Sequence, residues 1–95
     1  MAGYIIAEIE ITDPETYEEY KKIAPASIDR FKGEYLARGG RTERLEGDWQ
    51  PKRIVVLRFE SFERAKEWWN SKEYRAPKLL RQSAALTRMI VVDGS

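Results

Sequence analysis

Residues 4–15 read Tyr-Ile-Ile-Ala-Glu-Ile-Glu-Ile-Thr-Asp-Pro-Glu, and this stretch contains the junction between a strand and a helix. From Tyr4 to Ile11 apolar residues fall at alternate positions, which predicts a strand with two distinct faces. Asp13 suits the N-cap of a helix and Pro14 suits its first turn, so a helix is expected to begin at once. The first two elements are therefore a strand and a helix.

The helix that begins at this junction is followed by a second strand. An apolar stripe predicts that the helix continues to a C-cap at Gly33, with a kink or a local break at Pro25. A second strand is expected over residues 34–45. The pair Gly39-Gly40 interrupts it, which predicts a bulge or a sharp change of direction there.

The last part of the chain predicts a strand, two helices and a strand. Residues 53–59 are apolar on both faces, as in a strand that is covered on both sides. Ser61 and Ser71 are each placed to cap a helix. We expect the first of these helices to bury the stripe of Phe62, Ala65 and Trp69. The remaining expected elements are a helix over 73–85 and a strand over 88–92.

This order, βαββαβ, is the split pattern of a ferredoxin-like α+β fold, here expected as a single domain over residues 1–95. Right-handed crossovers place the helices on one face of a four-stranded antiparallel sheet. By alternation, the opposite face carries six side chains: Tyr4, Ile6, Glu8, Ile54, Val56 and Arg58. That face is too apolar to remain in water. We therefore expect a homodimer whose sheets face each other around a cavity.

The composition excludes several kinds of chemistry. The chain has no cysteine and no histidine, which excludes thiolate nucleophiles, Ser-His-Asp triads and axial-histidine haem sites. Neither a metal nor a cofactor is expected. Seventeen basic residues nearly balance sixteen acidic ones, which argues against a nucleic-acid partner. No apolar run could span a bilayer and no signal peptide is recognised, so a cytoplasmic protein without a membrane partner is expected.

Short motifs along nearly the whole chain carry a family resemblance: Tyr35 to Gly40, Leu45 to Trp49 with Pro51 and Arg53, Phe59 to Ser61, Ala65, Trp68 to Ser71, Glu73-Tyr74, Arg81, and Val92 to Gly94. Together they resemble the DUF1330 proteins of the dimeric α+β barrel superfamily. The resemblance implies the barrel fold and the dimer. The family has no established activity, so the resemblance implies no catalytic residue.

Three arginines are the main candidates for ligand binding. Arg38, Arg53 and Arg58 could each present a two-pronged donor to the carboxylate or phosphate of a small anionic organic ligand. The alternative is that they pair with acidic side chains across the sheet or a dimer interface. The available partners are Glu8, Glu10, Glu34 and Glu46.

Four further residues complete the candidate site. Glu8 is a weak candidate for a general base, provided that burial raises its pKa, and Tyr4 or Tyr35 would orient a substrate or donate a proton. Alternatively, Glu8 is salt-bridged and the tyrosines fill space. Trp49 would cover the cavity mouth or pack on the second protomer.

Two function classes remain open at the level of sequence. In the first, a homodimer binds or converts a small organic acid or lactone in its barrel, without a metal or histidine. In the second, the protein is a non-catalytic homo-oligomer whose barrel is filled by side chains. A cavity that admits nothing beyond water, with every charged group paired, would favour the second class.

Overall fold

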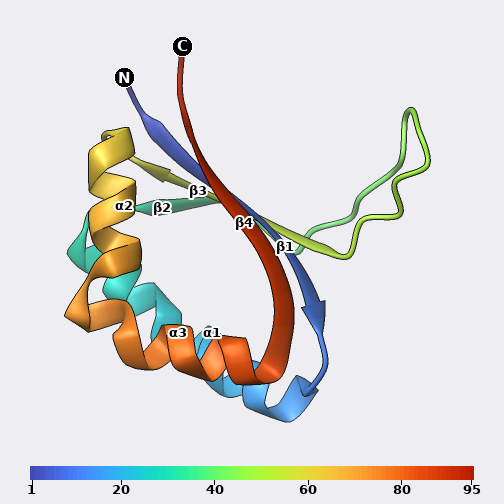
Figure 1. Cartoon of the computed structure of the whole chain (residues 1–95), viewed down its shortest axis with the longest axis horizontal. Helices are drawn as coiled ribbons and strands as arrows, with labels where there is room; N and C mark the ends of the chain where they lie inside the picture. The colour runs from blue at the N-terminus through green and yellow to red at the C-terminus, as the bar shows by residue number, and fades with distance from the viewer.

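The computed structural model describes residues 1–95. Its elements are β1 (Gly3–Ile11), α1 (Pro14–Arg30), β2 (Glu34–Arg38), β3 (Arg53–Phe59), α2 (Phe62–Asn70), α3 (Lys72–Ala84) and β4 (Ala85–Asp93). The strands form one antiparallel sheet in the order β2-β3-β1-β4. The helices lie together on one side of this sheet (Figure 1). The prediction of a ferredoxin-like α+β fold is confirmed.

The sheet separates a buried face from an open one. Alternate residues of β1, Ile5, Ala7 and Ile9, are buried beneath the helices. They share this core with Val55, Leu57 and Phe59 of β3 and with apolar and aromatic side chains of the helices. The alternation of apolar residues therefore predicted correctly which face of each central strand is buried. None of the helices is long and apolar enough to cross a membrane.

Helix α1 begins as expected but ends differently. The Asp13 carboxylate accepts a hydrogen bond from the Thr16 backbone N–H at 3.2 Å. Of the kink or local break expected at Pro25, the break does not occur, because the helix runs without interruption to Arg30. Lys32 takes the left-handed conformation, with φ of 58°. Gly33 lies just beyond and donates its N–H to an α1 carbonyl, so it follows the C-cap rather than forming it.

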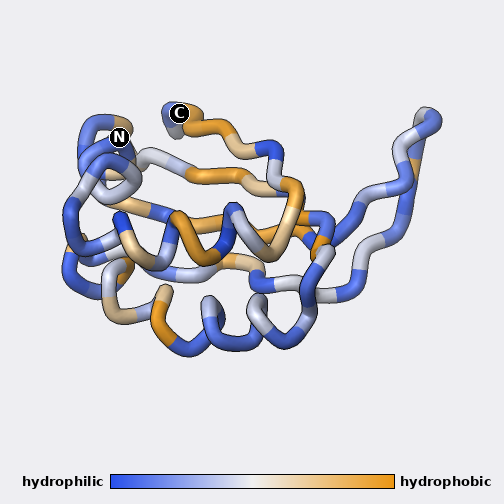
Figure 2. Tube along the Cα trace, turned by 60° about the horizontal axis from the view of Figure 1, so that its bottom comes forward, coloured by the Kyte–Doolittle hydropathy of each residue, from blue (hydrophilic) through white to orange (hydrophobic).

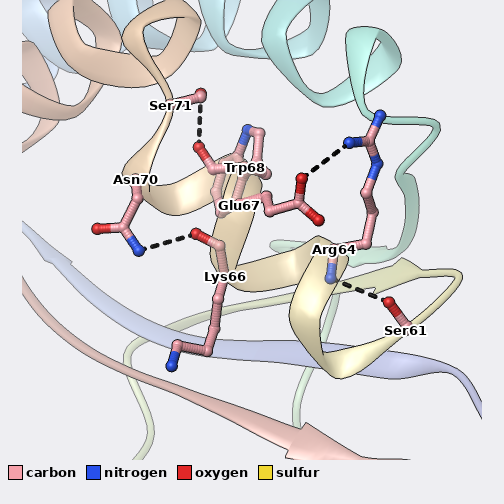
Figure 3. Close-up of polar contacts among 7 residues, drawn as sticks. All are labelled: Ser61, Arg64, Lys66, Glu67, Trp68, Asn70 and Ser71. Atoms are coloured by element: carbon pink, nitrogen blue, oxygen red, sulfur yellow. Dashed lines mark hydrogen bonds and ion pairs between the residues drawn. The ribbon is translucent and has the colours of Figure 1, made fainter.

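Helices α2 and α3 are joined by a serine that serves both. The Ser71 hydroxyl donates to the Trp68 carbonyl at 2.7 Å and accepts from the Tyr74 N–H at 3.1 Å. Figure 3 shows this end of α2, with Ser61 capping the other end. The expected buried stripe was wrong by one position, because α2 buries Trp68 and leaves Trp69 partly exposed.

The second strand is shorter than predicted. It ends at Arg38, and residues 39–52, hereafter the arm, have no regular structure and project from the body of the molecule (Figure 1). Figure 2 shows that the arm is mostly hydrophilic, so no apolar face holds it against the sheet. The irregularity in strand pairing lies between Tyr35 and Ala37 rather than at the two glycines.

Candidate functional site

A small cavity lies between the helices and the sheet. Its volume is about 30 Å³, which is room for a water molecule or for a group the size of a carboxylate. Most of its wall is the apolar core, but three arginines and three tyrosines also line it: Tyr17, Tyr20, Tyr35, Arg38, Arg53 and Arg81. We call this space the arginine cavity.

Arg53 enters the arginine cavity from the first position of β3. Its guanidinium packs over the ring of Tyr17, 5.5 Å from the ring centroid, and its Nε is buried without a hydrogen-bond partner. The residue beside it in space is Gly39, which has φ of 70° and donates its N–H to the Ile54 carbonyl at 2.8 Å. A Cβ at Gly39 would overlap the Arg53 guanidinium. The first glycine of the pair therefore makes room for the arginine.

Arg38 lies at the mouth of the arginine cavity. Its guanidinium stacks 4.5 Å from the centroid of the Tyr35 ring and donates to the Lys21 carbonyl of α1 at 2.9 Å. These contacts tie the end of β2 to the first helix. The side chain remains exposed, so it can reach a ligand that enters from solvent.

Arg81 comes from α3 and is the most buried of the three arginines, with 3% of its surface exposed. Its Nε donates to the Tyr74 hydroxyl at 3.2 Å, and that hydroxyl lies 2.7 Å from the hydroxyl of Tyr20. Sequence reasoning gave Arg81 no role. A signal was present, because Tyr74, Pro77 and Arg81 follow one another at helical spacing, which places an arginine on a buried stripe.

The tyrosines of this region are neutral hydrogen-bonding groups. Burial raises the pKa of Tyr17, Tyr20 and Tyr35 above the usual value of 10.0. Their hydroxyls therefore keep their protons at neutral pH. They can donate to an anion but cannot act as general bases there.

The arginine cavity carries positive charge without an acidic partner. No aspartate or glutamate lines it. The ion pairs of the chain involve other arginines and lysines, and none includes Arg38, Arg53 or Arg81. A buried cation without a counter-charge is costly. The arrangement is suited to an anion that supplies the missing charge.

The open face of the sheet shows the opposite arrangement around Glu8. Its carboxylate accepts from the Trp49 indole N–H at 2.8 Å, from the Arg88 Nε at 2.9 Å and from the Lys52 N–H at 3.4 Å. The side chain is only 12% exposed. Hydrogen bonds from Trp49 and then Arg88 lower the pKa of Glu8. The general-base hypothesis required a raised pKa, so the geometry gives it no support.

The sheet divides the residues singled out from the sequence into two groups. Arg38, Arg53 and Tyr35 line the arginine cavity under the helices. The other four are on the open face: Tyr4, Glu8, Arg58 and the arm residue Trp49, which reaches Glu8. Arg58 forms an ion pair with Glu34 at 3.4 Å, as the pairing alternative anticipated. Sequence reasoning missed the contributions of Arg81 and Arg88. No group of three or more potential metal ligands is present.

The comparison with protein families gives one match. The model of DUF1330, a domain of unknown function, matches residues 2–95. No curated protein is similar enough in sequence to count as a match.

Several solved structures share the fold. A protein of unknown function from Rhodopseudomonas palustris is 18% identical, with a TM-score of 0.77 over 99% of this chain and 82% of that one. SnoaB, a cofactor-independent oxygenase from Streptomyces nogalater, is 8% identical, with a TM-score of 0.68 over 99% and 93%. The de novo designed protein Foldit4 is 12% identical, with a TM-score of 0.63 over the full length of both chains. At these identities the likeness concerns the fold alone.

Proposed function

This chain belongs to the DUF1330 family, a family of unknown function, and from that premise we propose that it binds a small organic anion in the arginine cavity. Arg53 and Arg81 would hold the anionic group, and Arg38 would receive it at the mouth. The observation that carries the proposal is the presence of three guanidinium groups on one cavity that has no carboxylate. A guanidinium binds a carboxylate through paired, charge-assisted hydrogen bonds.

The ligand class follows from the size and polarity of the arginine cavity. A volume of about 30 Å³ accepts a carboxylate but not a whole organic molecule. The neutral hydroxyl groups of Tyr17 and Tyr20 can donate further hydrogen bonds to such a group. We therefore infer a small organic acid whose charged end enters the cavity. Conversion of the acid would begin with the same binding step.

We also propose that the protein is a homodimer. Val56, Ile6 and Ile90 lie side by side across β3, β1 and β4 on the open face. Ile6 is 38% exposed and Ile90 is 60% exposed. An apolar row of this kind in the middle of a sheet favours a covering partner. A second copy of the chain offers the same apolar surface, as a two-fold interface requires.

One observation favours the second function class. On the open face, which would line the barrel of a dimer, the carboxylate of Glu8 is fully paired. A protein of this kind would be a non-catalytic homo-oligomer that binds no small molecule. The two classes give opposite results when a small carboxylate is offered to the protein.

The test is a titration of the protein with acetate, followed through the arginine Nε–H signals in ¹H–¹⁵N spectra. We expect saturable shifts at Arg53 and Arg81. Arg53→Met should weaken binding about tenfold or more, because it removes hydrogen bonds to a charged group. Arg58→Met is the matched control, since that arginine is paired on the other face. The absence of saturable shifts, or equal losses in both variants, would falsify the proposal.

A further inference from the structure

A second hollow lies near the arginine cavity, between β4, the end of α2 and α3. We call it the edge groove, because β4 is the last strand of the sheet on that side. Its lining includes Lys66, Trp69, Arg81, Gln82, Thr87 and Met89. Its volume of about 430 Å³ falls in the range of small-molecule sites. It therefore has the room that the arginine cavity lacks.

The polar lining of the edge groove favours an anion. Arg81 and Lys66 both line the groove, and no carboxylate does. Lys66 forms no ion pair: its ammonium lies 5.8 Å from the centroid of the Phe62 ring. The hydroxyl of Thr87 is buried without a hydrogen-bond partner. A buried polar group of this kind is costly until something bonds to it.

The rest of the lining is apolar. Trp69, Met89 and Val91 are among the five hydrophobic residues that line the edge groove. Such a surface gains free energy by covering a hydrocarbon chain. The groove thus combines a positive end with an apolar wall, which matches a molecule that has a charged head and an apolar body.

The edge groove and the arginine cavity are neighbours. Ile5, Arg81 and Met89 line both of them. The 3% exposed Arg81 thus forms part of the wall between the two spaces. Met89, the most flexible apolar side chain of that wall, can change rotamer at little cost.

We propose that the edge groove binds the apolar body of a short-chain monocarboxylic acid whose carboxylate lies against Arg81. This inference rests on the proposed function, because the same arginine holds the charged group in both. It adds a ligand class, since acids with a hydrocarbon chain should bind better than acetate. It also places the ligand on the helix side of the sheet, next to the outer edge of β4.

The experiment compares acetate, butyrate, hexanoate and octanoate by calorimetric titration of the full chain. We expect affinity to rise about fourfold for each added methylene until the groove is filled. Gln82→Trp should fill the groove from its exposed rim. This variant should bind acetate like the wild type and lose the gain for the longer acids. Ser83→Trp is the matched control, because Ser83 is an exposed neighbour that does not line the groove.

Two outcomes would overturn this inference. If all four acids bind equally and acetate binding still depends on Arg53, the groove holds no part of the ligand and the proposed function survives. If the chain-length gain persists in Gln82→Trp, the hydrocarbon chain lies elsewhere. A failure of acetate and octanoate alike would instead remove the proposed function itself.

Discussion

The two faces of the sheet treat their charged groups in opposite ways. On the open face, Glu8 accepts hydrogen bonds from Trp49, Arg88 and the backbone of Lys52. On the helix-covered face, Arg53 and Arg81 have no acidic partner. A charged side chain whose partners all come from the chain itself is accounted for by a structural role. The buried charges that the chain leaves without a counter-charge are the basis of the proposed ligand site.

The two faces of the sheet also differ in what covers them. The helices already cover the arginine cavity, so a ligand that binds there would have to be small. The open face has no cover within the chain, and its middle row is apolar. We therefore expect a small molecule on one face and a second protein chain on the other. Substitutions on one face alone can test whether the two faces have these separate roles.

The largest effect is expected for Ile6→Asp on the open face. In a two-fold dimer this change buries two carboxylates without partners, one from each protomer, and the cost of desolvating them opposes association. We expect the dissociation constant of the dimer to rise at least about a hundredfold. Sedimentation velocity would measure it, with circular dichroism as a check on folding.

The matched control for Ile6→Asp is Leu79→Asp, because Leu79 is exposed on α3, away from the sheet. The control should sediment like the wild type. A wild-type protein that sediments as a monomer at micromolar concentration would contradict the division between the faces. An Ile6→Asp variant that remains dimeric would contradict it as well.

The fold could be predicted from local patterns, whereas the specific partner of each charged side chain could not. Alternation assigned Ile5 and Ile9 to the buried face because side-chain direction along a strand depends only on position. The two side chains that donate to Glu8, Trp49 and Arg88, lie 41 and 80 residues away in sequence. They depend on strand register and on the path of the arm, which no local pattern encodes. Trp49 thus reaches Glu8 through an arm that was predicted partly as a strand.

The arginine cavity was only partly predictable for a similar reason. Arg38 and Arg53 were recognised as candidates because a guanidinium can present two hydrogen-bond donors to a carboxylate or phosphate. Arg81 was missed, although its position on the buried stripe of α3 is visible in the sequence. That the three meet at one cavity depends on how α3 packs against the sheet. The spacing of residues within each element does not determine this packing.

A smaller effect is expected for Arg81→Met, which should raise the free energy of unfolding, whereas most core substitutions lower it. Removing a buried charge that has no counter-charge should stabilise the ligand-free protein, by about 1–2 kcal/mol. The Tyr74 hydroxyl keeps its bond to Tyr20, so no polar group is left unpaired. Urea unfolding at equal protein concentrations would measure the free energy of unfolding.

The matched control is Arg58→Met, which removes an exposed ion pair with Glu34. This change should alter the free energy of unfolding by less than about 0.5 kcal/mol. If Arg81→Met is strongly destabilising, the arginine is part of the architecture of the core. The contrast between the two faces would then lose its main support.

The smallest effect is expected from Glu8→Gln, which should lower the stability of the fold by an amount that depends on pH. The folded protein lowers the pKa of Glu8 below 4.5, so the carboxylate contributes stability that is present above pH 4.5 and is lost as the pH falls through the lowered pKa. Glu8→Gln should therefore be less stable than the wild type at neutral pH, and the difference should shrink below pH 4.5. Thermal unfolding from pH 7 to pH 3 would show this convergence.

The matched control is Glu10→Gln, because Glu10 is on the same strand but has no ion pair or side-chain hydrogen bond. The difference in stability between this variant and the wild type should not change with pH. A Glu8→Gln difference that is constant with pH would mean that packing of Trp49, rather than the charge of Glu8, organises the open face.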